Sequence, residues 1–189
     1  LGLSHAYSAS TQGNASVMDY PHPWIDLVAG GTPDLGKAYP EGIGEWDKVA
    51  ITYGYKVFPA GTNEREELNK IILDAAKRGL VFLTDRDARP DGGLHPTAHL
   101  WDNGKDAVAE LNRIGDVRAR ALARFDQRVI RPGAPMSSLE DALVPVYLLH
   151  RYQTLAASKL VGGADYTFAL RGDGQKVYQV VPGATQQAA

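Results

Sequence analysis

The amino-acid sequence predicts a mainly α-helical chain with a small β-hairpin near its C-terminal end. Apolar residues recur every three or four positions over 104–129 and again over 137–160, which predicts two helices. The short connection between them favours an antiparallel pair, and we expect this pair to be the stable nucleus of the fold. Two β-prone runs, 166–170 and 176–181, flank Gly172-Asp173-Gly174, a combination typical of a hairpin.

Two further helices are expected earlier in the chain. The first covers about 44–54, and the second begins at Asn63, with Glu66 at the spacing of a capping box. Gly79 ends the second helix, because glycine favours the left-handed conformation that follows a helix. The apolar run 80–83 predicts either a strand or a buried extended segment.

Two other stretches contain no helical periodicity. Residues 6–44 are rich in Gly, Pro, Ser, Asn and Asp, and residues 84–104 are also expected to be irregular, with a turn at 89–93. A long irregular stretch inside a compact domain is often functional. Wrapping around a cleft would account for residues 6–44.

Composition limits the classes of function. The 189 residues fit one globular domain, and a formal net charge of -2 gives no electrostatic basis for binding nucleic acid. No apolar run reaches the roughly 18 residues that a membrane-spanning helix needs. The chain has no cysteine, which excludes disulfides and thiolate metal ligands.

The most informative motif lies near the start of the chain. Gly2 and His5 have Gly-x-x-His spacing, and Met18 follows thirteen residues after His5 within Ser16-Val17-Met18-Asp19-Tyr20. Imidazole is a common zinc ligand. Together these segments resemble the end of the extended zinc motif H-E-x-x-H-x-x-G-x-x-H and the methionine-containing turn (Met-turn) of the metzincins. No H-E-x-x-H occurs in the sequence.

Four later segments make the resemblance narrower. They are 44–55, Thr84-Asp85-Arg86-Asp87-Ala88, 101–104 and 131–133. With them, the chain from Leu1 to about Gly163 is similar to the bacterial met-zincin family of zinc-dependent metallopeptidases. The resemblance implies the C-terminal helical subdomain of a zincin-like metallopeptidase that is periplasmic, cell-surface or secreted.

The same resemblance implies that the H-E-x-x-H helix stands before Leu1. We therefore expect zinc in the intact parent protein, but no zinc and no activity in this chain alone. The expected partners are a peptide or protein substrate and the upstream catalytic segment of the same protein. The resemblance, together with the pattern of elements, implies that 1–44 is a zinc-site tail with the Met-turn and an irregular cleft segment, 45–163 the helical subdomain, and 164–189 the hairpin with a truncated C-terminal end.

The resemblance also implies roles for four residues. His5 would be the third zinc ligand, and Met18 would lie beneath the metal as a hydrophobic floor. Tyr20 would reach the zinc or donate a hydrogen bond to the developing oxyanion; alternatively, it is a half-buried tyrosine whose hydroxyl bonds to backbone. Asp19 would brace the turn or a ligand histidine, or act only as a turn cap.

A second histidine pair, His95 and His99, has the spacing of helical zinc ligands. The intervening Pro96 and the missing glutamate argue against a metal site, so a loop with two solvated histidines is expected. The alternative to a peptidase is a noncatalytic helical scaffold or interaction domain. An H-E-x-x-H segment upstream in the parent would decide for the enzyme.

Overall fold

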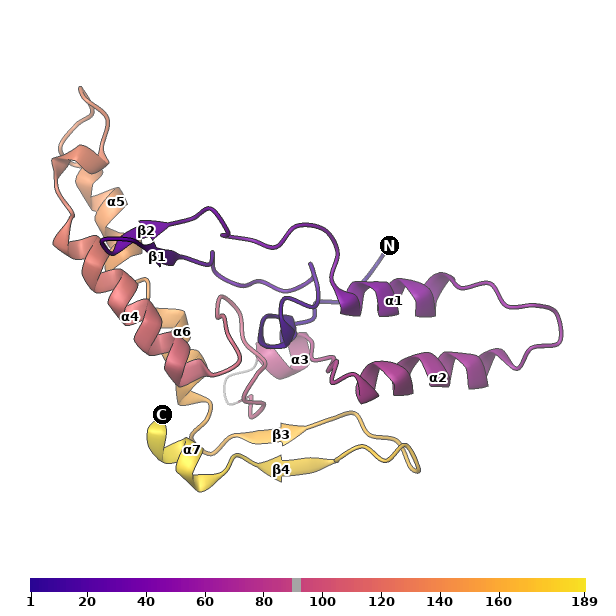
Figure 1. Ribbon diagram of the computed structural model, residues 1–189. Helices are drawn as coiled ribbons and strands as arrows, with labels where there is room; N and C mark the ends of the chain where they lie inside the picture. Colours follow the sequence, from indigo (N-terminus) through magenta and orange to yellow (C-terminus); the bar gives the residue numbers. More distant parts are fainter. Residues whose placement is uncertain (90–92) are drawn as a thin grey trace.

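Helices make up most of the regular structure, and the strands form two small antiparallel hairpins (Figure 1). This computed structural model describes residues 1–89 and 93–189. No helix among these residues is long and apolar enough to cross a membrane. The elements in chain order are η1 (Ala9–Gln12), β1 (Asp26–Val28), β2 (Thr32–Asp34), α1 (Glu45–Tyr55), α2 (Glu64–Lys77), α3 (Asp85–Ala88), α4 (Ala107–Ala123), η2 (Gln127–Val129), α5 (Ser138–Tyr147), α6 (Arg151–Ser158), β3 (Ala164–Tyr166), β4 (Tyr178–Val180) and α7 (Gly183–Ala188).

The helices α1 and α2 lie side by side at one end of the molecule, at the positions that the sequence predicts (Figure 1). Asn63 caps α2, because its Oδ1 accepts from the backbone N–H of Glu66 at 3.4 Å and its amide donates to the Glu66 carboxylate at 2.7 Å. The ring of Trp46 on α1 stacks on Phe82, with 5.2 Å between centroids. This contact joins the helical hairpin to the segment that follows α2.

The long helix pair is shorter than predicted. α4 ends well before residue 129, and the second helix is divided into α5 and α6 by a turn after Tyr147. Pro145 lies inside α5 and has no N–H for a helical hydrogen bond, and the helix ends two residues later. α4 runs opposite to α5 and α6 and packs against both, and Arg118 Nε donates to the carbonyl of Tyr147 at 2.7 Å (Figure 1).

Burial is uneven along this pair. α5 has no buried residue, whereas α4 buries Glu110, Ile114 and Val117 and α6 buries Gln153, Ala156 and Ala157. α5 packs mainly against α4 and η2, so the outer part of its apolar stripe stays open. Val144 is 44% exposed and Tyr147 is 56% exposed.

Another part of the core lies around the irregular N-terminal segment. Tyr7 and Leu83 are fully buried, and the Tyr7 N–H donates to the Leu83 carbonyl at 2.9 Å. Ser8 Oγ donates to the carbonyl of Val81, whose own N–H donates to Gln12 Oε1, both at 2.9 Å. The apolar run 80–83 is therefore not a strand but an irregular segment that is partly buried and ends at the fully buried Leu83.

The C-terminal hairpin is present but has shorter strands than predicted. β3 pairs antiparallel with β4, with Ala164 opposite Val180 and Tyr166 opposite Tyr178. A second hairpin, β1–β2, and the short helix α3 occur in stretches predicted to be irregular. The turn predicted at 89–93 falls on 90–92, outside the described residues.

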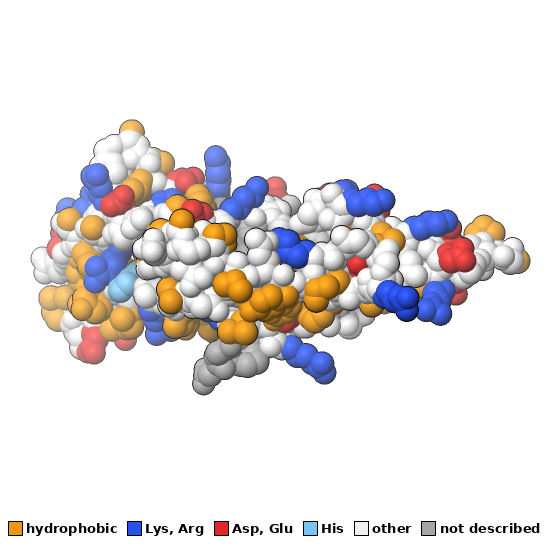
Figure 2. Space-filling model, turned by 90° about the horizontal axis from the view of Figure 1, so that it is seen from below, with side chains coloured by type: hydrophobic (Ala, Val, Ile, Leu, Met, Phe, Trp, Pro, Cys, Tyr) orange, Lys and Arg blue, Asp and Glu red, His pale blue; other side chains and the backbone are white. Residues whose placement is uncertain are grey.

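The C-terminal hairpin exposes much of its apolar surface. Figure 2 shows the molecule from below, with hydrophobic side chains gathered on the face where β3 and β4 lie. Large side chains at least half exposed in this region are Phe168, Leu170, Val177, Tyr178 and Val180. A two-stranded ribbon cannot bury both of its faces, so this exposure follows from the small size of the sheet.

Candidate functional site

His5 lies on the N-terminal segment with one ring nitrogen engaged and the other available. Gly2 has φ +69°, a left-handed conformation that suits glycine and directs the following residues toward the core. The Nδ1 atom of His5 lies 2.9 Å from Asp85 Oδ2, and the side chain is 28% exposed. No described residue forms a hydrogen bond with the Nε2 atom of His5.

The segment containing Met18 lies directly against the residue after His5. The backbone N–H of Ala6 donates to the Met18 carbonyl at 3.0 Å, and the Met18 N–H donates to Ser16 Oγ at 3.0 Å. Ser16 Oγ in turn donates to Asp47 Oδ1 at 2.5 Å. Asp47 belongs to α1, so a buried helical carboxylate fixes the turn.

Asp19 holds the same turn from its other side. One carboxylate oxygen accepts from the backbone N–H of Ser10 and the other from that of Tyr20, each at 2.7 Å. Burial raises the pKa of Asp19, and these backbone hydrogen bonds partly oppose the rise. In this geometry Asp19 braces the turn, and the carboxylate that contacts His5 is Asp85.

Tyr20 packs against His5. The two rings meet edge to face, with 5.2 Å between centroids, and the ring of Tyr7 stacks near Tyr20 at 6.2 Å. Tyr20 is 46% exposed, and no described residue forms a hydrogen bond with its hydroxyl. The backbone-bonded alternative for this hydroxyl therefore does not hold in the structure.

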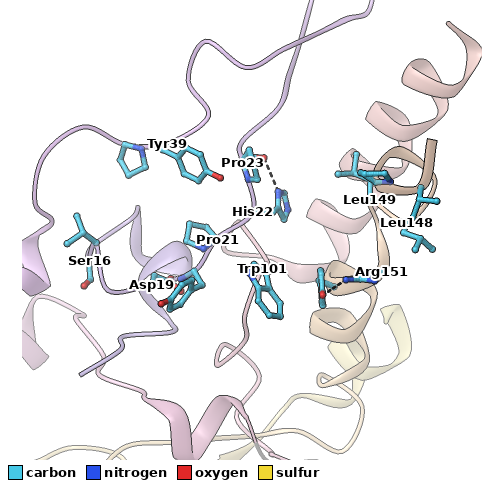
Figure 3. Close-up of a pocket in the computed structure, with 16 residues that line it drawn as sticks. Ser16, Asp19, Pro21, His22, Pro23, Tyr39, Trp101, Leu148, Leu149 and Arg151 are labelled. Atoms are coloured by element: carbon cyan, nitrogen blue, oxygen red, sulfur yellow. Dashed lines mark hydrogen bonds between the residues drawn. The ribbon is translucent and has the colours of Figure 1, made fainter. Parts of the chain in front are cut away.

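A cavity of about 690 Å³ adjoins Tyr20. Ser16, Val17, Asp19 and Tyr20, with the prolines after them, form one wall, the corner between α5 and α6 forms the other, and Trp101 lies between them (Figure 3). Its lining is predominantly apolar and aromatic, including Pro21, Pro23, Tyr39, Trp101, Leu148 and Leu149. Cavities of this size and composition are typical of sites that bind a ligand side chain.

Three residues that the sequence did not single out individually surround His5. The Tyr7 hydroxyl lies 3.0 Å from His5 Nδ1 and donates to Asp85 Oδ1 at 3.1 Å. Arg89 donates from Nη2 to the Tyr7 hydroxyl at 2.9 Å and from Nε to Asp85. Hydrogen bonds from His5 and Arg89 lower the pKa of Asp85 to about 2. We call His5, Tyr7, Asp85 and Arg89 the His5 network.

The only sequence signal near Asp85 is the family resemblance of the segment Thr84-Asp85-Arg86-Asp87-Ala88. This segment forms α3, where the Thr84 N–H donates to Asp87 Oδ2 at 3.0 Å. This bond closes the first turn and holds Asp85 facing the N-terminal segment. The sequence showed the similarity of this segment to a known family but not the contact with His5, which is 80 positions away.

The expectation of two solvated histidines is wrong. His95 and His99 are only 2% and 6% exposed. His95 Nε2 lies 3.1 Å from the Tyr166 carbonyl and His99 Nε2 lies 2.8 Å from the Pro96 carbonyl. Burial lowers the pKa of His99 to about 4. Over residues 1–89 and 93–189, no group of three or more His, Cys, Asp or Glu side chains is arranged to hold a metal ion.

Comparison with known proteins gives one match. The model of the family described as Met-zincin matches residues 1–189. A zinc metallopeptidase-like fold and zinc are general features of that family. No curated protein and no solved structure matches the chain.

Proposed function

Because the chain belongs to the Met-zincin family, we propose that it is the C-terminal portion of the catalytic domain of a zinc-dependent metallopeptidase that hydrolyses peptide bonds. His5 supplies the third zinc ligand, the Met18 turn lies beneath the site, and Tyr20 acts on the substrate. The sequence contains no H-E-x-x-H, so the other ligands and the general base come from the upstream catalytic segment of the parent protein. This chain alone is inactive.

The observation that carries the proposal is the arrangement of His5, Met18 and Tyr20. The Ala6–Met18 backbone bond seats the turn against His5, and the Tyr20 ring packs on the imidazole. With Nδ1 engaged by Asp85, the Nε2 lone pair remains for a metal. The residues present thus suit the role of a single imidazole ligand in a larger set.

When bound, zinc would polarise the scissile carbonyl and activate water. Tyr20 contributes its hydroxyl as a hydrogen-bond donor, and the packing of its ring fixes the position of that hydroxyl. Contacts with His5 and Tyr7 hold the ring, while the hydroxyl is left free of described partners. A donor held in this way stabilises negative charge that develops on the carbonyl oxygen in the transition state.

The cavity beside Tyr20 supports a peptide substrate with an apolar side chain. Its walls are formed by prolines, Trp101 and the leucines of the α5–α6 corner. The same cavity lies beside Tyr20, whose ring packs on His5, which is the position a peptidase needs for a substrate side chain. The lining of this cavity by residues of α5 and α6 favours the peptidase over the scaffold.

Zinc binding by the parent protein tests the proposal. The parent, with its H-E-x-x-H segment, should retain one zinc ion after dialysis against a weak chelator, as measured by elemental analysis. His5→Ala should weaken zinc binding and abolish peptide hydrolysis. His150→Ala is the matched control, because His150 lies at the start of α6 and has no carboxylate partner among the described residues. Undiminished zinc affinity in His5→Ala would overturn the proposal.

A further inference from the structure

We propose that Asp85 is a positioning residue, held by Tyr7 and Arg89, that fixes the tautomer and orientation of His5 so that its Nε2 atom faces the metal. The part of this inference that concerns a metal at His5 rests on the proposed function. The part that concerns the effect of Asp85 on the imidazole is independent of it, because that effect follows from contacts within the chain. Asp85 touches no substrate and acts through His5.

The protonation pattern follows from the partners. An ionised carboxylate only accepts hydrogen bonds, so the groups that approach Asp85 must donate. His5 Nδ1 lies 2.9 Å from Oδ2, and the Tyr7 hydroxyl donates to Oδ1 at 3.1 Å. The proton of the neutral imidazole is therefore on Nδ1, and the lone pair is on Nε2.

Arg89 completes the arrangement. Its guanidinium donates to both Asp85 and the Tyr7 hydroxyl, the latter at 2.9 Å. The tyrosine oxygen accepts from Arg89, and because a protonated Nδ1 of His5 cannot accept, the tyrosine proton is donated to Asp85 Oδ1. Each group in the His5 network has a defined role as donor or acceptor, which leaves the imidazole one favourable orientation.

The fold keeps Asp85 in place through the buried core. The carbonyl of Leu83, two residues before Asp85, accepts a hydrogen bond from the backbone N–H of Tyr7. The two chain segments that carry His5 and Asp85 are therefore bonded together. On the other side of α3, Asp87 accepts from the Tyr166 hydroxyl at 2.5 Å. Metal-binding histidines commonly donate their second N–H to a carboxylate held in this manner.

The simpler alternative is that Asp85 only forms a surface ion pair with Arg89, four residues later. The chain offers a matched control for it. Asp74 forms an ion pair with Arg78 at the same spacing, with 3.1 Å between Oδ2 and Nε; the Asp74 side chain is 67% exposed and that of Asp85 43%. Asp74 makes no contact with a histidine in the described part of the chain.

The first test measures the tautomer of His5 without zinc. In the metal-free parent protein labelled with ¹⁵N-histidine, the ring nitrogen shifts should show His5 protonated on Nδ1 at a pH where the imidazole is neutral. Asp85→Ala should move most of the population to the Nε2–H form, and Asp85→Asn should give an intermediate shift. Asp74→Ala should change nothing. A wild-type tautomer in Asp85→Ala and Asp85→Asn would overturn the proposal.

The second test measures zinc affinity by competition with a chelator. Asp85→Ala should weaken binding by about 10–100-fold, the usual effect of removing the partner of a ligand histidine. Asp85→Asn keeps an acceptor oxygen and the side-chain shape, so it should recover part of the loss and should fold even if the alanine variant does not. Asp74→Ala should stay within about twofold.

The two proposals fail in different ways. If His5→Ala weakens zinc binding but neither Asp85 variant does, the positioning role is wrong and the proposed function stands. If both Asp85 variants change the His5 tautomer while His5→Ala leaves zinc binding unchanged, the proposed function is wrong and the effect of Asp85 on the imidazole stands.

Discussion

Burial in this molecule does not follow the distribution of regular secondary structure. The irregular segment from Ala6 to Ser16 contains seven buried residues, whereas α5, a regular helix of ten residues, contains none. We call α4, α5 and α6 the helical arm. The irregular segment therefore packs into the interior against Leu83, whereas α5 keeps an open face, and the corner between α5 and α6 lines the cavity.

The irregular segment is stable because side chains satisfy its backbone. The Asp47 carboxylate accepts the N–H groups of Val17 and Gly44, and Gln12 bridges to Val81. Buried backbone groups without such partners would be unfavourable. Gly44 also lies so close to Ala15 that an added Cβ would be 2.0 Å from its carbonyl oxygen. These constraints give the loop the fixed geometry that a metal ligand needs.

The comparison predicts unequal effects of one substitution in the two regions. Leu83 is fully buried and Leu155, in the helical arm, is 61% exposed. Leu83→Ala should lower the free energy of unfolding by about 2–5 kcal/mol, and Leu155→Ala by less than about 1 kcal/mol. Urea denaturation of both variants measures the difference. Equal losses would mean that the Leu155 side chain contributes to stability as much as the buried Leu83 does.

The second prediction concerns chemistry at the border between the two regions. In the parent protein, Tyr20→Phe should lower kcat by about 10²–10³, because the transition state loses one hydrogen-bond donor. Zinc content and thermal stability should remain close to wild type, since the ring contacts with His5 and Tyr7 are kept. A change of only a few-fold in kcat would remove Tyr20 from the site.

The third prediction uses pH to probe the buried polar part of the core. The pKa of His99 is lowered to about 4 by burial, so the unfolded state binds more protons than the folded state between about pH 4 and 6.5. Its contribution to stability is present above pH 6.5 and is lost as pH falls toward 4, by about 3 kcal/mol in total.

Asp102 changes the stability in the opposite direction as pH falls, because its pKa is raised to about 7 by burial, with a smaller contribution from Asp19. The stability of His99→Gln relative to wild type isolates the histidine. The variant should gain relative stability as pH falls from 6.5 to 4, measured by thermal unfolding at several pH values. A pH-independent difference between the two proteins would show that His99 titrates normally in the folded state.

Local pattern predicted the elements that depend on local interactions. The periodicity and the Asn63 cap predicted α2, and helical spacing predicted α1. The burial of residues 6–16 was not predictable in this way, because its hydrogen bonds reach Asp47 and the run 80–83, far along the chain. For the same reason the motif indicated His5 but could not identify Asp85 as its partner.

The smallest expected effect concerns Met18. The turn is held through its backbone, by the bonds from Ala6 N–H to the Met18 carbonyl and from Met18 N–H to Ser16 Oγ. A side chain of similar volume leaves both bonds intact, so Met18→Leu should lower stability by less than about 1.5 kcal/mol. The zinc affinity of the parent carrying Met18→Leu should stay within a few-fold of wild type. Asp47→Ala removes the anchor of the turn, so it should lower both the stability and the zinc affinity. If Met18→Leu lowered zinc affinity strongly at unchanged stability, the thioether itself would act on the metal site, and the role of a passive floor would be wrong.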